Sequence, residues 1–156
     1  MKLSKLYSNK AFHNTEFNTG LNVIYADVKA KISTNSSHSI GKTKFIKLLD
    51  FLLLKKITPK KHFLTSTRDT ETNTLKFNGY AFYLEILLNS GSYLTIKRTV
   101  ADSSKISLKI SENSVKDFEI PISWDFDNIS IDEAREKLNE YLNFDFFKNN
   151  TELDYR

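Results

Sequence analysis

The sequence predicts an α/β fold in which a mixed or antiparallel sheet surrounds one central helix. Three observations support this prediction: a mostly apolar helical segment over residues 42–55, alternation of apolar and polar residues between 80 and 120, and a capped helix after residue 130. With 156 residues, 40% of them hydrophobic, the chain is long enough to bury a core, and we expect residues 1–156 to form one domain.

The first elements are short strands. Residues 2–8 are predicted to form one strand and residues 16–18 another. After a turn at Asn18-Thr19-Gly20, the apolar run 21–25 predicts a buried strand. Residues 27–40 are rich in Ser, Asn and Lys, so we expect them to form a mobile loop.

A candidate phosphate-binding loop follows at Gly41-Lys42-Thr43, between the predicted strand and the predicted helix. Glycine lets the backbone approach a phosphate, and the N–H groups of a helix N-terminus face the anion. In such loops the lysine reaches the β- and γ-phosphates and the threonine hydroxyl ligates Mg²⁺. The prediction is therefore an ATP and Mg²⁺ site, with Thr43 as the metal ligand and these binding residues: Ser39, Ile40, Gly41, Lys42, Thr43 and Lys44.

An alternative interpretation of this segment stays open. The full motif has a second glycine five positions before Gly41, where this chain has Ser36. An ordinary loop before a core helix would show the same three residues. In the helix itself only Lys44, Lys47 and Asp50 interrupt the apolar residues, which predicts burial of most of its surface.

The segment after this helix, residues 55–78, is polar and carries a basic cluster. Because the cluster is dense, it can contact a nucleic-acid backbone; alternatively it is a solvated helix end whose charge suits the helix dipole. The cluster consists of Lys55, Lys56, Lys60, Lys61 and His62.

Residues 80–120 predict antiparallel strands joined by short turns. The strands are expected at 80–88, 93–100, 105–111 and 115–120. The alternation predicts that Glu85 and the pair Lys97-Arg98 are at the surface, and that Trp124 is a core anchor. One face of the first strand carries Phe82, Leu84, Ile86 and Leu88.

A C-terminal helix is predicted to begin after Ser130. Ser130 and Glu133 form a capping box, and Glu133 is spaced to pair with Lys137 at i,i+4. Its apolar face is expected to hold Ile131, Ala134, Leu138, Tyr141 and Leu142.

Composition limits the classes of protein to which this chain can belong. The chain has no cysteine, which excludes disulfides and thiolate metal sites. The longest apolar run, residues 51–54, is too short to span a bilayer, so we expect a cytoplasmic protein without membrane contact. A net charge of +4 is too small to require a nucleic-acid partner.

Taken in order, three pieces resemble the N-terminal lobe of an ABC-type ATPase head of the SMC and RecN kind. They are residues 1–7 with Glu16-Phe17-Asn18, the strand Gly20-Leu21-Asn22-Val23-Ile24, and the loop and helix from Ile40 to Phe51. Together with residues 80–111 they are similar to a bacterial branch that carries a domain of unknown function after its coiled coil. The resemblance implies an ATP-binding half head in a DNA-repair or phage-defence complex, in which heads dimerise and DNA is a possible partner.

Several parts of a complete head are missing from this chain. It has no glutamine, no apolar strand ending in Asp-Glu and no Leu-Ser-Gly-Gly motif, so a catalytic base cannot be assigned; the nearest acids in apolar surroundings are Asp50 and Glu85. The family places these parts in a C-terminal lobe, and we expect the chain to be a truncated head that needs such a lobe, or a partner subunit, for hydrolysis. The alternative is a non-enzymatic head remnant that serves as a protein-interaction module.

Overall fold

The computed structural model describes residues 1–23, 42–58, 62–69 and 71–142. The strands form one six-stranded sheet in the order β2-β1-β3-β4-β5-β6, in which every neighbouring pair is antiparallel. The α/β class is confirmed, and the sheet is antiparallel rather than mixed. The elements are β1 (Lys2–Ser8), β2 (Thr15–Glu16), α1 (Lys42–Leu52), α2 (Phe63–Ser66), β3 (Ala81–Leu87), β4 (Tyr93–Thr99), β5 (Lys105–Ser111), β6 (Phe126–Ser130) and α3 (Ile131–Leu142).

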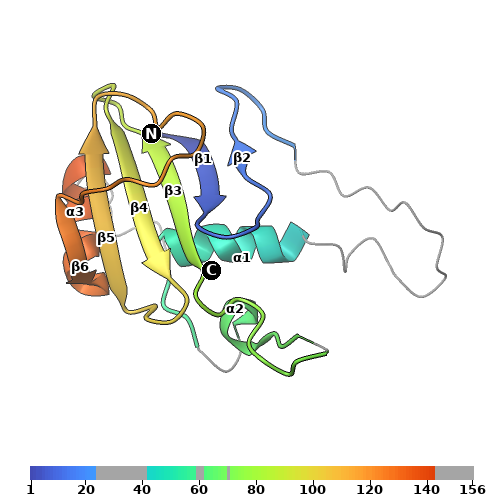
Figure 1. Ribbon diagram of the computed structural model, residues 1–156. Helices are drawn as coiled ribbons and strands as arrows, with labels where there is room; N and C mark the ends of the chain where they lie inside the picture. The colour runs from blue at the N-terminus through green and yellow to red at the C-terminus, as the bar shows by residue number, and fades with distance from the viewer. Residues whose placement is uncertain (24–41, 59–61, 70, 143–156) are drawn as a thin grey trace, which may run out of the picture.

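The strands of the central meander pair antiparallel, as their alternation and short turns predict. Leu84 of β3 pairs with Ile96 of β4, and Ile96 pairs with Leu108 of β5, so all three side chains lie on the same face of the sheet. This face is covered by α1 and α3, while residues 112–125 cross the opposite face (Figure 1). The described part of the chain therefore has helices on one side of the sheet and an irregular segment on the other.

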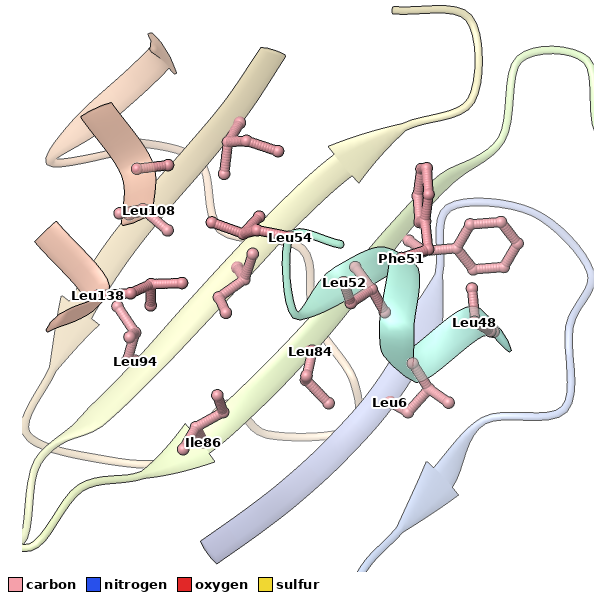
Figure 2. Packing of buried hydrophobic residues seen from close by; sticks show 14 of the residues in the cluster. Leu6, Leu48, Phe51, Leu52, Leu54, Leu84, Ile86, Leu94, Leu108 and Leu138 are labelled. Carbon is pink, nitrogen blue, oxygen red and sulfur yellow. The ribbon is translucent and has the colours of Figure 1, made fainter. Parts of the chain in front are cut away.

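The main core lies between α1 and the sheet. In Figure 2, Leu48, Phe51 and Leu52 of α1 lie over the sheet that carries Leu6 and Leu84, in one cluster of buried residues. All five side chains are buried. From α3, Ala134 and Leu138 close the same core at its other end. Burial of this apolar surface is the main stabilising contribution to the fold.

The helix α1 ends at Leu52, earlier than the sequence predicts. Leu54 has a φ of 62°, a left-handed conformation that ends a helix. Two buried or half-buried arginines then satisfy carbonyl groups of this turn: Arg98 Nη1 donates to Phe51 O at 2.5 Å, and Arg135 Nη2 donates to Leu54 O at 2.7 Å. The expectation that Arg98 is a surface residue was wrong, because the carbonyl groups of Phe51, Lys55 and Ser103 give its buried guanidinium hydrogen-bond partners.

On the second face, residues 112–125, which we call the strap, pack over the sheet. Glu85 is buried and accepts hydrogen bonds from Ser4 Oγ, Ser114 Oγ and Val115 N, each at 2.7 Å. Two predictions were therefore wrong. Glu85 does not face solvent, and residues 115–120 do not form a strand, because their contacts with Glu85 draw the chain across the sheet instead of along its edge.

The strap also carries the aromatic residues of a second, smaller apolar cluster. Phe118 and Trp124 are partly buried against Tyr7 and Tyr83, whose rings stack with centroids 5.0 Å apart. Trp124 lies with its ring centroid 6.2 Å from that of Tyr83, nearly parallel to it. Trp124 thus anchors the strap, not the main core.

Several other predictions can be compared with the structure. Leu21 and Val23 are exposed and in no strand, so the described part of the predicted strand 21–25 is not buried. The polar segment after α1 contains the short helix α2, whose Leu64 is buried. Ser130 caps α3 by accepting from Glu133 N at 3.2 Å, as predicted, but Lys137 forms its ion pair with Glu140.

No helix within the described residues is long and apolar enough to cross a membrane.

Candidate functional site

The predicted binding residues divide into two groups. Lys42, Thr43 and Lys44 form the start of α1, and all three side chains are exposed. Ser39, Ile40 and Gly41 lie outside the described residues, as does the predicted loop 27–40. The structure thus places the lysine and threonine of the motif together at a helix N-terminus.

The start of α1 is electropositive. Its first turn contains no acidic side chain, while Lys42 and Lys44 add two charges to the partial positive charge of the helix N-terminus. The helix is anchored through its second half, by Leu48, Phe51 and Leu52, so the first turn remains accessible to solvent. Accessible N–H groups, lysine ammonium groups and a hydroxyl are the donors that a phosphate group requires.

An apolar pocket of about 260 Å³ lies directly beside this turn. Lys44 lines it, together with Phe45 and Leu48 of α1. Phe12 contributes from the connection between β1 and β2, and meets Phe82 of β3 edge to face with centroids 5.3 Å apart. The remaining lining residues are His13, Thr15, Phe63, Leu64 and Phe77.

Sequence reasoning did not find this pocket. Its aromatic side chains come from the β1–β2 connection, from α1, from the α2 region and from β3, and only the folded sheet brings them together. Phe63 and Phe77 form an edge-to-face pair with centroids 5.6 Å apart. The available signal was the presence of aromatic residues within the otherwise polar segments 9–16 and 55–78. An apolar, aromatic-lined pocket suits a planar ring or an apolar chain.

The other end of α1 carries the basic cluster. Lys47, Lys55, Lys56 and His62 line a second pocket of about 190 Å³, together with Asp50, Ile57 and Thr58. Asp50 is ion-paired with Lys55 at 2.8 Å. Burial lowers the pKa of His62, and the charges of Lys47 and Arg98 lower it further. The electropositive surroundings favour an anionic group in this pocket.

Two of the described carboxylates lie away from the start of α1. Asp50 is held by Lys55 near the far end of the helix, and Glu85 lies beneath the strap on the opposite face of the sheet. Within residues 1–23, 42–58, 62–69 and 71–142, no cluster of three His, Asp or Glu side chains could hold a metal ion. Glu16 of β2 does lie near this end of the helix, because it lines a further pocket together with Phe45. The described residues therefore offer donors for a phosphate at the start of α1, but no group of side chains that could hold a cation by itself.

No protein-family model, no curated protein and no solved structure matches this chain.

Proposed function

We propose that this chain is the ATP- and Mg²⁺-binding half of an SMC/ABC-type ATPase head. The observation that carries the proposal is the position of an exposed, basic helix start next to an aromatic-lined pocket. A nucleotide has the same two parts, an anionic phosphate chain and a planar apolar ring. The resemblance of the sequence around Gly41 to a phosphate-binding loop supports the same ligand.

In this proposal each described residue has a defined role. Lys42 neutralises charge on the phosphates, and the first N–H groups of α1 donate to their oxygens. Thr43 would hold Mg²⁺, which would supply neutralisation of the phosphate charge. The base enters the pocket beside Phe45, where stacking on aromatic rings does not require polar partners.

Hydrolysis in heads of this kind requires a glutamine, an Asp-Glu strand end and a signature motif, which this sequence lacks. A second lobe, either a C-terminal ATPase lobe or a partner subunit, has to supply the base, the water-positioning glutamine and the signature motif. The proposed biological setting is a dimer of heads in a DNA-repair or phage-defence complex, with DNA as a possible partner; it rests on the sequence resemblance alone.

The test is titration of the purified chain with Mg-ATP, followed by calorimetry or by NMR. Binding is expected in the micromolar to millimolar range because one lobe provides only one side of the site. Lys42→Ala is expected to abolish binding without changing the melting temperature, since the side chain is exposed. Lys105→Ala, an exposed lysine on β5, is the matched control and should bind as the wild type does.

Two results would count against the proposal. One is a wild-type chain that ignores millimolar Mg-ATP, and the other is equal binding by wild type and Lys42→Ala. The second candidate function, a non-enzymatic interaction module, would then take precedence. It is favoured by one specific observation, the exposure of two apolar side chains, Ile46 on α1 and Leu53 in the turn after it.

A further inference from the structure

The outer face of α1 combines exposed apolar side chains with positive charge. Ile46 is 56% exposed and Leu53 is 40% exposed. Ile46 belongs to α1 and Leu53 to the turn directly after it, and their exposure shows that both side chains face solvent and not the sheet. Residues 42–56 contain five lysines and one aspartate, and that aspartate is already paired with Lys55.

The basic pocket of about 190 Å³ lies at the end of this face. Lys47 and Lys56 line it, and neither forms an ion pair with any described residue. Two exposed lysines around a small concave site leave room for a carboxylate from outside. We call the surface formed by Ile46, Lys47, Leu53, Lys56 and this pocket the basic face.

The strap has the complementary properties. Residues 112–125 contain four acidic residues and one lysine. Ile120 is 44% exposed, and Ile122 is fully exposed on the other side of Pro121. Asp117 and Glu119 are also exposed and form no ion pair within the described chain. We call the surface formed by Asp117, Glu119, Ile120 and Ile122 the acidic face.

The acidic face is held in place from below. Glu85 anchors the start of the strap through Ser114 Oγ and Val115 N, and Trp124 packs under its end. Asp117 and Phe118 have φ values of 46° and 59°, a tight left-handed turn that the Phe118 contact with Tyr7 maintains. The strap is thus anchored at both ends and presents carboxylates and isoleucines together.

We propose that the acidic face of one copy of this chain docks on the basic face of a second copy. The two faces lie on opposite sides of the sheet, because α1 and the strap cover opposite sides of it (Figure 1). They cannot meet within one chain. Glu119 or Asp117 enters the basic pocket between Lys47 and Lys56, and Ile122 covers the apolar pair Ile46 and Leu53.

Charge selects this head-to-tail arrangement over a symmetric one. Pairing two basic faces, or two acidic faces, would bring like charges together, which disfavours an isologous dimer. A heterologous contact leaves one free face at each end, so further copies can add. Each patch is small, and the association is therefore weak and sensitive to ionic strength. The contact does not use Lys42 or Thr43, so it is independent of nucleotide binding.

The experiment is sedimentation velocity of the intact chain over a range of concentrations from about 10 μM to about 1 mM, a range typical of weak association. The wild type is expected to associate progressively, and to return to monomer at high salt. Ile46→Asp blocks the basic face and Ile122→Asp blocks the acidic face, so each variant alone is expected to remain monomeric. An equimolar mixture of the two is expected to form a dimer and no larger species, because each retains the face that the other lacks.

Leu75→Asp is the matched control, since Leu75 is 39% exposed but belongs to neither face. It should associate as the wild type does. Circular dichroism checks that the variants are folded, and Glu119→Lys, a surface change that does not touch the core, provides a second way to block the acidic face. The proposal is overturned by a wild type that stays monomeric throughout, by a mixture that forms no dimer, or by equal loss of association in Leu75→Asp.

Discussion

Arg98 of β4 clamps Phe51 of α1 in two ways: its guanidinium lies 4.3 Å from the centre of the Phe51 ring, and its Nη1 donates to the Phe51 carbonyl oxygen. Arg98 Nη1 also donates to Lys55 O at 3.2 Å, and Nε donates to Ser103 O at 2.7 Å. Burial and the charge of Arg135 lower the pKa of Arg98 to about 10, which leaves it protonated at neutral pH. One strand residue thus fixes where the helix ends.

Replacement of Arg98 by Met is expected to reduce the free energy of unfolding by about 3 kcal/mol, because buried carbonyl groups lose their charged donor. Arg98→Lys should recover only part of this loss, since one ammonium group cannot replace three separate guanidinium contacts. Urea denaturation measures both. A methionine variant as stable as the wild type would show that the clamp contributes nothing.

Glu85→Gln is expected to loosen the strap. The carboxylate accepts from three donors, whereas an amide has one acceptor oxygen and adds donors of its own. Stability should fall by about 1–3 kcal/mol. Hydrogen exchange should accelerate in residues 113–119 while β3 and β4 stay protected. If exchange rises equally in the strands, the glutamate supports the whole sheet and not the strap in particular.

Turnover of ATP by this chain alone is expected to equal the background rate, because the chain has no glutamine, no apolar strand ending in Asp-Glu and no Leu-Ser-Gly-Gly motif. Phosphate release measured with and without a chain that carries a C-terminal ATPase lobe tests this expectation. The lobe should raise the rate, and Lys42→Ala in this chain should remove the increase. Activity of the isolated chain that depends on Lys42 would reveal a base that the proposal does not include.

Stability is expected to decrease below about pH 6.5, the pKa of an unfolded histidine, through His62. Burial lowers the pKa of folded His62, so the unfolded state binds the proton more readily and acid favours unfolding. Protonation would also prevent His62 Nδ1 from accepting the hydrogen bond of Leu64 N that caps α2. The stability that comes from the lowered pKa of His62 is fully present above the pKa of the unfolded state. It is lost as the pH falls through the pKa of His62 in the folded state.

His62→Asn separates this effect from the titration of other groups, because asparagine caps a helix without titrating between pH 5 and 8. Denaturation of both proteins at several pH values gives the comparison. The difference in unfolding free energy between wild type and variant should change between pH 7.5 and 5. A constant difference would mean that His62 does not titrate in this range.

The sequence predicted the elements that are determined by residues close together in the chain. The alternation from Phe82 to Leu88 predicted which face of this strand meets the main core, and Ser130 marked the start of α3. The motif likewise placed Lys42 and Thr43 at a helix start. Glu85 and Arg98 interrupt the same alternation as buried charges, and their partners lie in segments far away in the sequence. No local pattern identifies such partners.

The candidate site also has one part that consecutive residues determine and one part that distant residues determine. Its basic helix start follows from consecutive residues, whereas its aromatic pocket needs Phe12, Phe45 and Phe82 from three separate elements. The sequence also predicted that α1 is buried on most of its surface, but the described residues cover only one side of it. The apolar residues that remain exposed are those for which we propose a second copy as the partner.

The position of β1 between β2 and β3 has a consequence for how the chain folds. Strands β3, β4 and β5 follow one another in the sequence and can pair through short turns. Strand β1, in contrast, pairs with β3 across a long stretch of sequence, as Leu6 does with Leu84. Closing so long a loop costs entropy before any contact compensates for it. We therefore expect the meander to form early and β1 to join late, so that the core face beneath α1 is completed only in the final step of folding.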